Sequence, residues 1–196
     1  MSLSLSLRSS QVSAVDALRT DSASLTTQLV GIIGFAALTA LGAQFKIYVW
    51  EVPFTLQTLA VYGSGLYLGW KNGLLAQALY LMIGLFFPVY AGEGFGPAYL
   101  FGAVSAGYLL AYPLSAAAIG FMSKRFNGLS GSVLSMMAGS LVLFTFGVTW
   151  LHFAADHTTW FESLDKGWIR FLPVDLAKIL LVTLVYQGTR SLTKNG

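Results

Sequence analysis

The sequence predicts an all-α integral membrane protein, a bundle of six transmembrane helices. The first observation behind this prediction is composition: 56% of the 196 residues are hydrophobic and only 10% are charged, far from the average of soluble domains. The second is that apolar stretches recur, each near the roughly 20 residues that a helix needs to cross a bilayer. These stretches cover residues 29–45, 54–69, 73–91, 98–122, 131–155 and 171–188.

Six helices divide the chain into a cytoplasmic N-terminal arm (1–28), a transmembrane substrate-binding domain (29–190) and a cytoplasmic tail (191–196). With this count, seven basic residues lie on the side of the two termini and three in the loops on the opposite side. The excess of basic residues on one side marks the cytoplasmic face of a membrane protein. We therefore expect a multi-pass protein of the cell membrane with both termini in the cytoplasm.

The first predicted helix has one face of small residues. Within it, Ala36 and Ala40 are spaced four apart, which lets another helix approach closely in lipid. Two interpretations follow from this spacing. The pair packs against a neighbouring helix of the same chain, or it forms a docking stripe for a separate membrane subunit.

The second and third helices are bounded by prolines. Pro53 predicts an extended or turned start, with the helix beginning near Thr55, and Pro88 ends the third helix. The stretch PVYAGEGFGPAY that follows is too rich in glycine and proline for regular helix. It is expected to form a loop on the outer side, either a lid over the bundle or a plain connector.

The longest hydrophilic loop, HFAADHTTWFESLDKGWIR, follows the fifth helix. His152, Asp156 and His157 raise the question of a metal site, but their spacing matches no zinc signature, so an aromatic and acidic interfacial loop is the expected structure. The chain has no cysteine and no nucleotide-binding motif. We therefore expect neither an enzyme nor a bound cofactor or metal, and any ATP-driven activity has to come from a partner.

The last helix carries Asp175 and Lys178 three residues apart, on one helix face. A charge at membrane depth costs at least roughly 2.5–3.5 kcal/mol, so both side chains are expected to face the bundle interior. They either neutralise each other or bind a polar solute. Thr55 and Gln57 enter the membrane from the same outer side, and the Gln57 amide offers both a donor and an acceptor.

Three ordered motifs resemble the BioY family, the biotin-binding S components of energy-coupling-factor (ECF) transporters. The motifs are VPFTLQTLAV (52–61), LMIGLFFPVYAG (81–92) and LPVDLAKIL (172–180), and the resemblance runs from about residue 30 to the end of the last helix. The chain departs from the family pattern at AVSAGYL (103–109), which keeps Gly107, Tyr108 and Leu109, and at Glu93.

The resemblance implies a biotin pocket near the outer face, covered by loops. It also implies a partner module of a coupling protein and two ATPases that supplies energy, or a subunit that works without such a module of its own. The substrate-binding residues that it implies are Asp175, Lys178, Gln57, Thr55, Tyr90, Gly92, Glu93 and Tyr108. Ala36 and Ala40 would form the docking element for the coupling protein. The resemblance implies no nucleic-acid partner.

The roles of the two charged residues stay open at this point. Lys178 suits the carboxylate of biotin and Asp175 suits its ureido N–H groups, but the roles reverse if Asp175 only holds Lys178 in place. The alternative function is a secondary transporter or channel for another small polar solute, in which Asp175 and Lys178 act as a proton-coupled gate.

Overall fold

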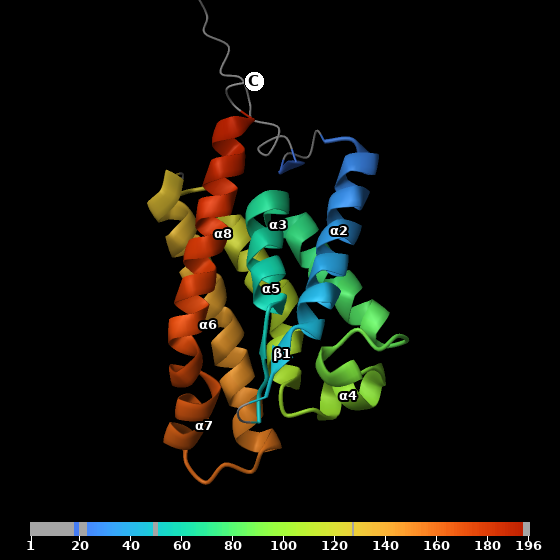
Figure 1. The fold of residues 1–196 in the computed structure, drawn as a ribbon, viewed down its shortest axis with the longest axis vertical. Helices are drawn as coiled ribbons and strands as arrows, with labels where there is room; N and C mark the ends of the chain where they lie inside the picture. The colour runs from blue at the N-terminus through green and yellow to red at the C-terminus, as the bar shows by residue number, and fades with distance from the viewer. Residues whose placement is uncertain (1–17, 20–22, 49–50, 127, 194–196) are drawn as a thin grey trace, which may run out of the picture.

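The structure is a computed structural model that describes residues 18–19, 23–48, 51–126 and 128–193; it is a helical bundle with one short β-hairpin (Figure 1). In chain order the elements are α2 (Leu25–Gln44), β1 (Lys46–Ile47), β2 (Phe54–Thr55), α3 (Gln57–Gly84), η1 (Ala91–Glu93), α4 (Gly96–Gly102), α5 (Ala106–Met122), α6 (Gly128–Ala154), α7 (Trp160–Gly167), η2 (Ile169–Phe171) and α8 (Leu172–Leu192).

Helix α3 folds back on itself at Gly69, whose φ of 75° and ψ of −176° suit only glycine. Hydrogen bonds join its two antiparallel halves: Gln57 Nε2 donates to the Tyr80 hydroxyl over 2.6 Å, and Gln77 Nε2 donates to Ser64 Oγ over 3.1 Å. This 28-residue element therefore supplies two antiparallel segments of the bundle. Together with α2, α5, α6 and α8 it gives six long helical segments within the described residues, and the predicted all-α membrane bundle is confirmed.

The prediction of one continuous helix over residues 98–122 is wrong. Helices α4 and α5 meet at an angle of 86°, with Ala103 between them in an extended conformation. A broken helix leaves carbonyl groups without partners. The indole Nε1 of Trp150 on α6 donates to the Ala103 carbonyl over 3.0 Å, so α6 stabilises the break.

The bundle exposes apolar side chains and buries polar ones. By length and hydropathy α2 and α6 can each cross a membrane, and the α4–α5 pair qualifies when taken together. The exposed fraction is 58% for Ile33 on α2 and 61% for Leu184 on α8, whereas Gln57, Gln77 and Asp175 are almost fully buried. Since lipid rather than water surrounds such a surface, this distribution is the one expected of a membrane bundle.

Figure 1 shows two ends of the bundle, which we call the terminal end and the loop end. The start of α2 and the end of α8 lie at the terminal end; the β-hairpin, α4 and α7 gather at the loop end. At the terminal end, the guanidinium of Arg19 donates to the Tyr186 hydroxyl over 2.8 Å and to Ser123 Oγ over 2.6 Å. This contact ties part of the predicted arm to the bundle, while residues 1–17 and 20–22 of the arm, and 194–196 of the tail, lie outside the described residues.

The hydrophilic loop between α6 and α8 contains a helix that the sequence analysis did not predict. Thr159 caps α7, since its Oγ1 accepts a hydrogen bond from the Glu162 amide over 3.2 Å. One turn later Lys166 Nζ lies 2.9 Å from Glu162 Oε1. The cap and this pair, four residues apart, stabilise a short amphipathic helix that hydropathy alone does not indicate.

Candidate functional site: a polar and aromatic pocket at the loop end

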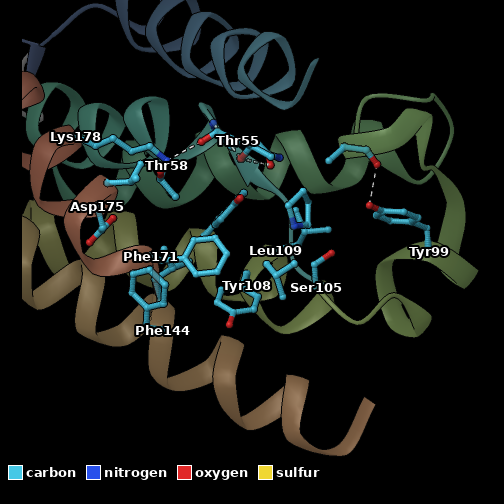
Figure 2. A pocket seen from close by; sticks show the side chains of 17 residues that line it. Thr55, Thr58, Tyr99, Ser105, Tyr108, Leu109, Phe144, Phe171, Asp175 and Lys178 are labelled. Carbon is cyan, nitrogen blue, oxygen red and sulfur yellow. Dashed lines mark hydrogen bonds between the residues drawn. The ribbon is translucent and has the colours of Figure 1, made fainter. Parts of the chain in front are cut away.

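A pocket lies between α3, α5, α6 and α8 at the loop end, with the β-hairpin and η1 beside it (Figure 2). Polar groups of α3 and α8 form one side and aromatic rings of α5, α6 and η2 form the other. The lining residues are Val52, Pro53, Thr55, Gln57, Thr58, Ala91, Tyr99, Ser105, Tyr108, Leu109, Tyr112, Leu143, Phe144, Phe171, Val174, Asp175 and Lys178.

Asp175 is the deepest charged group of the pocket, with an exposed fraction of 4%. Pro173 favours the start of α8 at Leu172, because proline fits the first turn of a helix. Asp175 therefore lies in the first turn of α8, where its side chain points into the bundle. The Tyr62 hydroxyl donates to Asp175 Oδ1 over 2.6 Å, and Ser140 Oγ donates to Oδ2 over 2.5 Å. Each carboxylate oxygen therefore has one protein donor and keeps capacity for a second.

Lys178 follows one turn later on α8 and reaches toward the start of α3. Its Nζ donates to the Thr55 carbonyl oxygen over 2.6 Å and to Thr58 Oγ1 over 2.9 Å. Since an ammonium carries three N–H groups, one remains for a ligand. The ion pairs within the described residues do not include one between Asp175 and Lys178. The two charged groups of α8 therefore form no direct ion pair, and each is held by uncharged hydrogen-bond partners.

Thr55 and Gln57 are bonded to each other at the hairpin side of the pocket. Thr55 Oγ1 donates to Gln57 Oε1 over 2.9 Å, and Gln57 Nε2 donates onward to the Tyr80 hydroxyl. The Gln57 side chain is thus fixed by its neighbours. One N–H group of its amide and one acceptor position on its oxygen remain for further bonds.

Aromatic rings form the apolar side of the pocket. Tyr108 donates its hydroxyl to the Gly167 carbonyl over 2.7 Å, so this side chain presents its ring rather than a free hydroxyl. Phe144 stacks on Trp168 with ring centroids 5.6 Å apart, and Phe171 stacks on Phe54 at 4.1 Å. Such a surface accommodates the apolar part of a small ligand.

The sequence analysis missed several lining residues. Tyr112 lies one turn after Tyr108 on α5 and shares its face, so helical spacing could have found it. Phe144 and Phe171 carried no comparable signal, because aromatic residues are frequent throughout the chain and only the fold brings these two together.

The predicted covering loop lies at the pocket, but three of its residues do not line it. Ala91 lines the pocket, whereas Tyr90 is fully buried, stacks on Tyr99 and donates its hydroxyl to the Leu81 carbonyl over 2.7 Å. Gly92 and Glu93 are exposed, with positive φ of 73° and 62°. Of the eight predicted substrate-binding residues, the structure thus brings five to the pocket: Asp175, Lys178, Gln57, Thr55 and Tyr108.

An ionic cluster at the loop end connects α7 to the segment before β2. Lys166 Nζ lies 2.9 Å from both Glu51 Oε1 and Glu162 Oε1. The hydrogen bond from Lys166 lowers the pKa of Glu51, and the bonds to Glu162 and Glu51 raise the pKa of Lys166. Glu51 directly precedes Val52 and Pro53, so this cluster holds one side of the pocket mouth in place.

The two histidines of the predicted loop meet at one serine. Nδ1 of His152 and Nδ1 of His157 lie 2.9 Å and 3.0 Å from Ser163 Oγ, and His152 stacks on Trp160. Within the described residues the structure contains no group of three or more histidine, aspartate or glutamate side chains placed to hold a metal. The histidines instead connect α6 to α7.

The small-residue pair of α2 faces the chain itself. Ala36 has an exposed fraction of 1% and belongs to the core, while Ala40 is half-buried beside it. The structure therefore fits the interpretation in which this pair packs within the chain. Docking of a partner through Ala36 and Ala40 stays a prediction, and the structure shows no free surface at Ala36.

Comparison with known proteins identifies the family. The sequence model of the BioY family matches residues 11–195. A probable biotin transporter BioY of Lysinibacillus sphaericus is 33% identical over 178 residues, covering 85% of this chain and 90% of that protein. The biotin transporter BioY of Thermotoga maritima is 32% identical, covering 81% of this chain and 92% of its own length.

A solved structure agrees in fold. The S-component for biotin from an ECF-type ABC transporter superposes with a TM-score of 0.77 at 25% identity, over 87% of this chain and 93% of that one. Sequence and fold thus agree over nearly the whole chain, and this protein belongs to the BioY family.

Proposed function

We propose that this protein is the biotin-binding membrane subunit of a vitamin uptake transporter. The observation that carries the proposal is the pocket, which places a fixed carboxylate and an ammonium with a free N–H one turn apart, opposite a wall of aromatic rings. The names of its relatives and of the structural neighbour support the same ligand.

The chemistry of biotin matches this arrangement. The ureido ring of biotin carries N–H donors, and one of them suits a free acceptor position of Asp175. Lys178 then serves an acceptor oxygen of the ligand with its third N–H, and Gln57 adds a neutral amide beside them. The apolar part of the ligand packs on Tyr108, Phe144 and Phe171, where burial contributes roughly 25 cal/mol per Å² of apolar surface.

We propose that energy for uptake comes from a separate ECF module of a coupling protein and ATPases. The sequence has no nucleotide-binding motif of its own, and the structural neighbour is a component of an ECF-type ABC transporter. The distribution of basic residues supports a cell-membrane orientation in which the terminal end faces the cytoplasm and the pocket faces outward.

Binding of biotin to the purified protein tests this proposal. Wild-type protein is expected to co-purify with biotin, detected by mass spectrometry, and Asp175→Asn and Lys178→Ala are expected to weaken binding at least about tenfold, because each removes a charge-assisted hydrogen bond. Lys124→Ala, an exposed lysine at the terminal end, is the matched control. Unchanged affinity in both pocket variants would contradict the site, and failure of the saturated wild-type protein to retain biotin would contradict the ligand.

The alternative of a proton-coupled gate relied on a direct pair between Asp175 and Lys178. Each of these residues instead bonds to other groups, Asp175 to two hydroxyls and Lys178 to Thr55 and Thr58. Uptake of another small polar solute into liposomes that contain this protein without any ATPase, driven by a proton gradient, is the result that would favour the alternative.

A further inference from the structure

Behind the pocket, Tyr62, Ser140 and Asp175 form a hydrogen-bonded cluster that joins α3, α6 and α8, which we call the carboxylate triad. We propose that Tyr62 and Ser140 are positioning residues: they orient the Asp175 carboxylate toward N–H donors of the ligand and thereby set both the affinity and the donor selectivity of the site. This inference rests on the proposed function and assigns roles to two residues that lie outside the pocket lining.

The positions of the three residues distinguish Asp175, which can contact a ligand, from Tyr62 and Ser140, which hold Asp175 in place. Tyr62, Ser140 and Asp175 have exposed fractions of 0%, 6% and 4%. Asp175 lines the pocket, whereas neither hydroxyl residue is among the lining residues in the described part of the chain. Tyr62 and Ser140 therefore act on a ligand through Asp175.

The geometry of the two bonds fixes the carboxylate. One donor binds each oxygen, over 2.6 Å for Tyr62 and 2.5 Å for Ser140, and hydroxyl donors reach a carboxylate at such lengths when the bond is charge-assisted. The two donors come from different helices, so rotation of the carboxyl group would break at least one of the bonds. The acceptor positions that remain are held in one direction before any ligand arrives.

Preorganisation of this kind has a physical consequence for binding. A carboxylate that turns freely must be ordered when the ligand binds, and an underbonded carboxylate in a buried site is costly. The triad removes both costs in advance. A ligand with a ring N–H group, as in a cyclic urea, gains from this arrangement because the acceptor position of Asp175 that it meets is already oriented.

A purely structural role predicts something different. If the triad only connected three helices, loss of a hydroxyl would lower the stability of the ligand-free protein and leave the preference among ligands unchanged. A positioning role predicts that the preference for N–H donors itself declines. The test therefore needs ligands that differ by a single N–H group as well as a measurement of stability.

The chain offers variants that separate these cases. Ser140→Thr and Ser140→Val add nearly the same volume and differ in the hydroxyl, and Tyr62→Phe removes only the phenol oxygen. Ser115→Ala is the matched control, since the Ser115 hydroxyl is also buried and donates to the Gly139 carbonyl over 2.8 Å, next to Ser140 but away from Asp175. The ligands are biotin and its two analogues methylated at one or the other ureido nitrogen.

Dissociation constants and thermal stability of the ligand-free protein are measured for each variant. Tyr62→Phe and Ser140→Val are expected to weaken biotin binding about tenfold or more, the loss typical of a hydrogen bond to a charged group, while Ser140→Thr and Ser115→Ala stay within about threefold of wild type. In the two weakened variants, the penalty for methylating the ureido nitrogen that faces Asp175 is expected to shrink.

Two results would overturn the inference. One is biotin binding by Tyr62→Phe and Ser140→Val that equals wild type. The other is weakened binding that only parallels a loss of stability shared with Ser115→Ala, with the methylation penalty unchanged. If wild-type protein binds no biotin, the proposed function fails and this inference with it, which the wild-type arm of the same experiment reveals.

Discussion

Lys178 Nζ donates a 2.6 Å hydrogen bond to the carbonyl oxygen of Thr55, which joins the last helix to the β-hairpin at the pocket. A second bond, to Thr58 Oγ1, reaches the first turn of α3. The ammonium is thus held by one backbone oxygen and one hydroxyl rather than by a carboxylate. Its charge is not compensated within 4 Å by Asp175 and is free to attract an acceptor oxygen of the ligand.

Thr58→Val is expected to weaken biotin binding by about three- to tenfold. Valine keeps the shape of threonine but removes the hydroxyl that holds Lys178, so the ammonium loses one of its two fixed bonds. Thr58→Ser, which keeps the hydroxyl, is the control in the same binding assay. Wild-type affinity in Thr58→Val, or a loss in Thr58→Ser as large as in Thr58→Val, would contradict a role that depends on the hydroxyl alone.

Tyr108→Phe separates the ring of Tyr108 from its hydroxyl. The hydroxyl bond to the Gly167 carbonyl is buried, so its loss is expected to destabilise the protein by about 1–3 kcal/mol. Biotin affinity of the folded protein is expected to stay within about threefold of wild type, because only the ring faces the pocket. Tyr108→Leu removes the ring and is expected to weaken binding much more. Isothermal titration and thermal unfolding in detergent distinguish the two effects, and a large affinity loss in Tyr108→Phe would contradict the assignment.

Gly69→Ala tests the reversal within α3. The backbone of Gly69 lies in a region that side chains disfavour by about 1–3 kcal/mol, and alanine there is expected to lower the unfolding temperature. Gly34→Ala is the matched control, since Gly34 lies on the exposed face of α2 and an added methyl group meets nothing within 4 Å. A similar unfolding temperature for both variants would show that the turn at Gly69 tolerates a side chain.

The ion pair between Glu51 and Lys166 predicts that acid pH loosens the side of the pocket formed by Val52 and Pro53. The hydrogen bond from Lys166 lowers the pKa of Glu51 below its ordinary value of 4.5. A carboxyl group whose pKa is lowered in the folded state contributes stability above its unfolded pKa and loses that contribution as the pH falls through the folded pKa. The contact is therefore intact at neutral pH and is lost as the pH falls through the folded pKa of Glu51, which lies below 4.5.

Rates of biotin release between pH 3.5 and 7 measure this effect. Release from wild-type protein is expected to accelerate at the acid end of this range, whereas Lys166→Met is expected to release biotin faster at neutral pH and with less dependence on pH. The Asp165–Arg170 pair, with an N–O distance of 2.6 Å on the same segment, provides the control substitution Asp165→Asn. Identical pH profiles for wild type and Lys166→Met would exclude this cluster as the cause.

Much of the architecture was determined by the sequence alone. Apolar stretches with few charges specify a membrane bundle, since the hydrophobic effect and the cost of burying charge act on composition directly. The spacing of Asp175 and Lys178 placed both on one face of the last helix, and Pro53 indicated an extended start to the second. In the structure Asp175 and Lys178 line one pocket together with Thr55 and Gln57, which agrees with the predicted set of polar residues.

The tertiary structure decided which groups meet. Helical spacing brought Asp175 and Lys178 to one face, but only the positions of α3 and α6 supplied Tyr62 and Ser140 to the carboxylate, and only the β-hairpin supplied the Thr55 carbonyl to the ammonium. At the break beside Ala103, likewise, the Ala103 carbonyl accepts a hydrogen bond from Trp150 of another helix. Periodicity reports what one segment prefers, whereas a buried hydrogen bond between distant segments forms only once packing has brought both partners together.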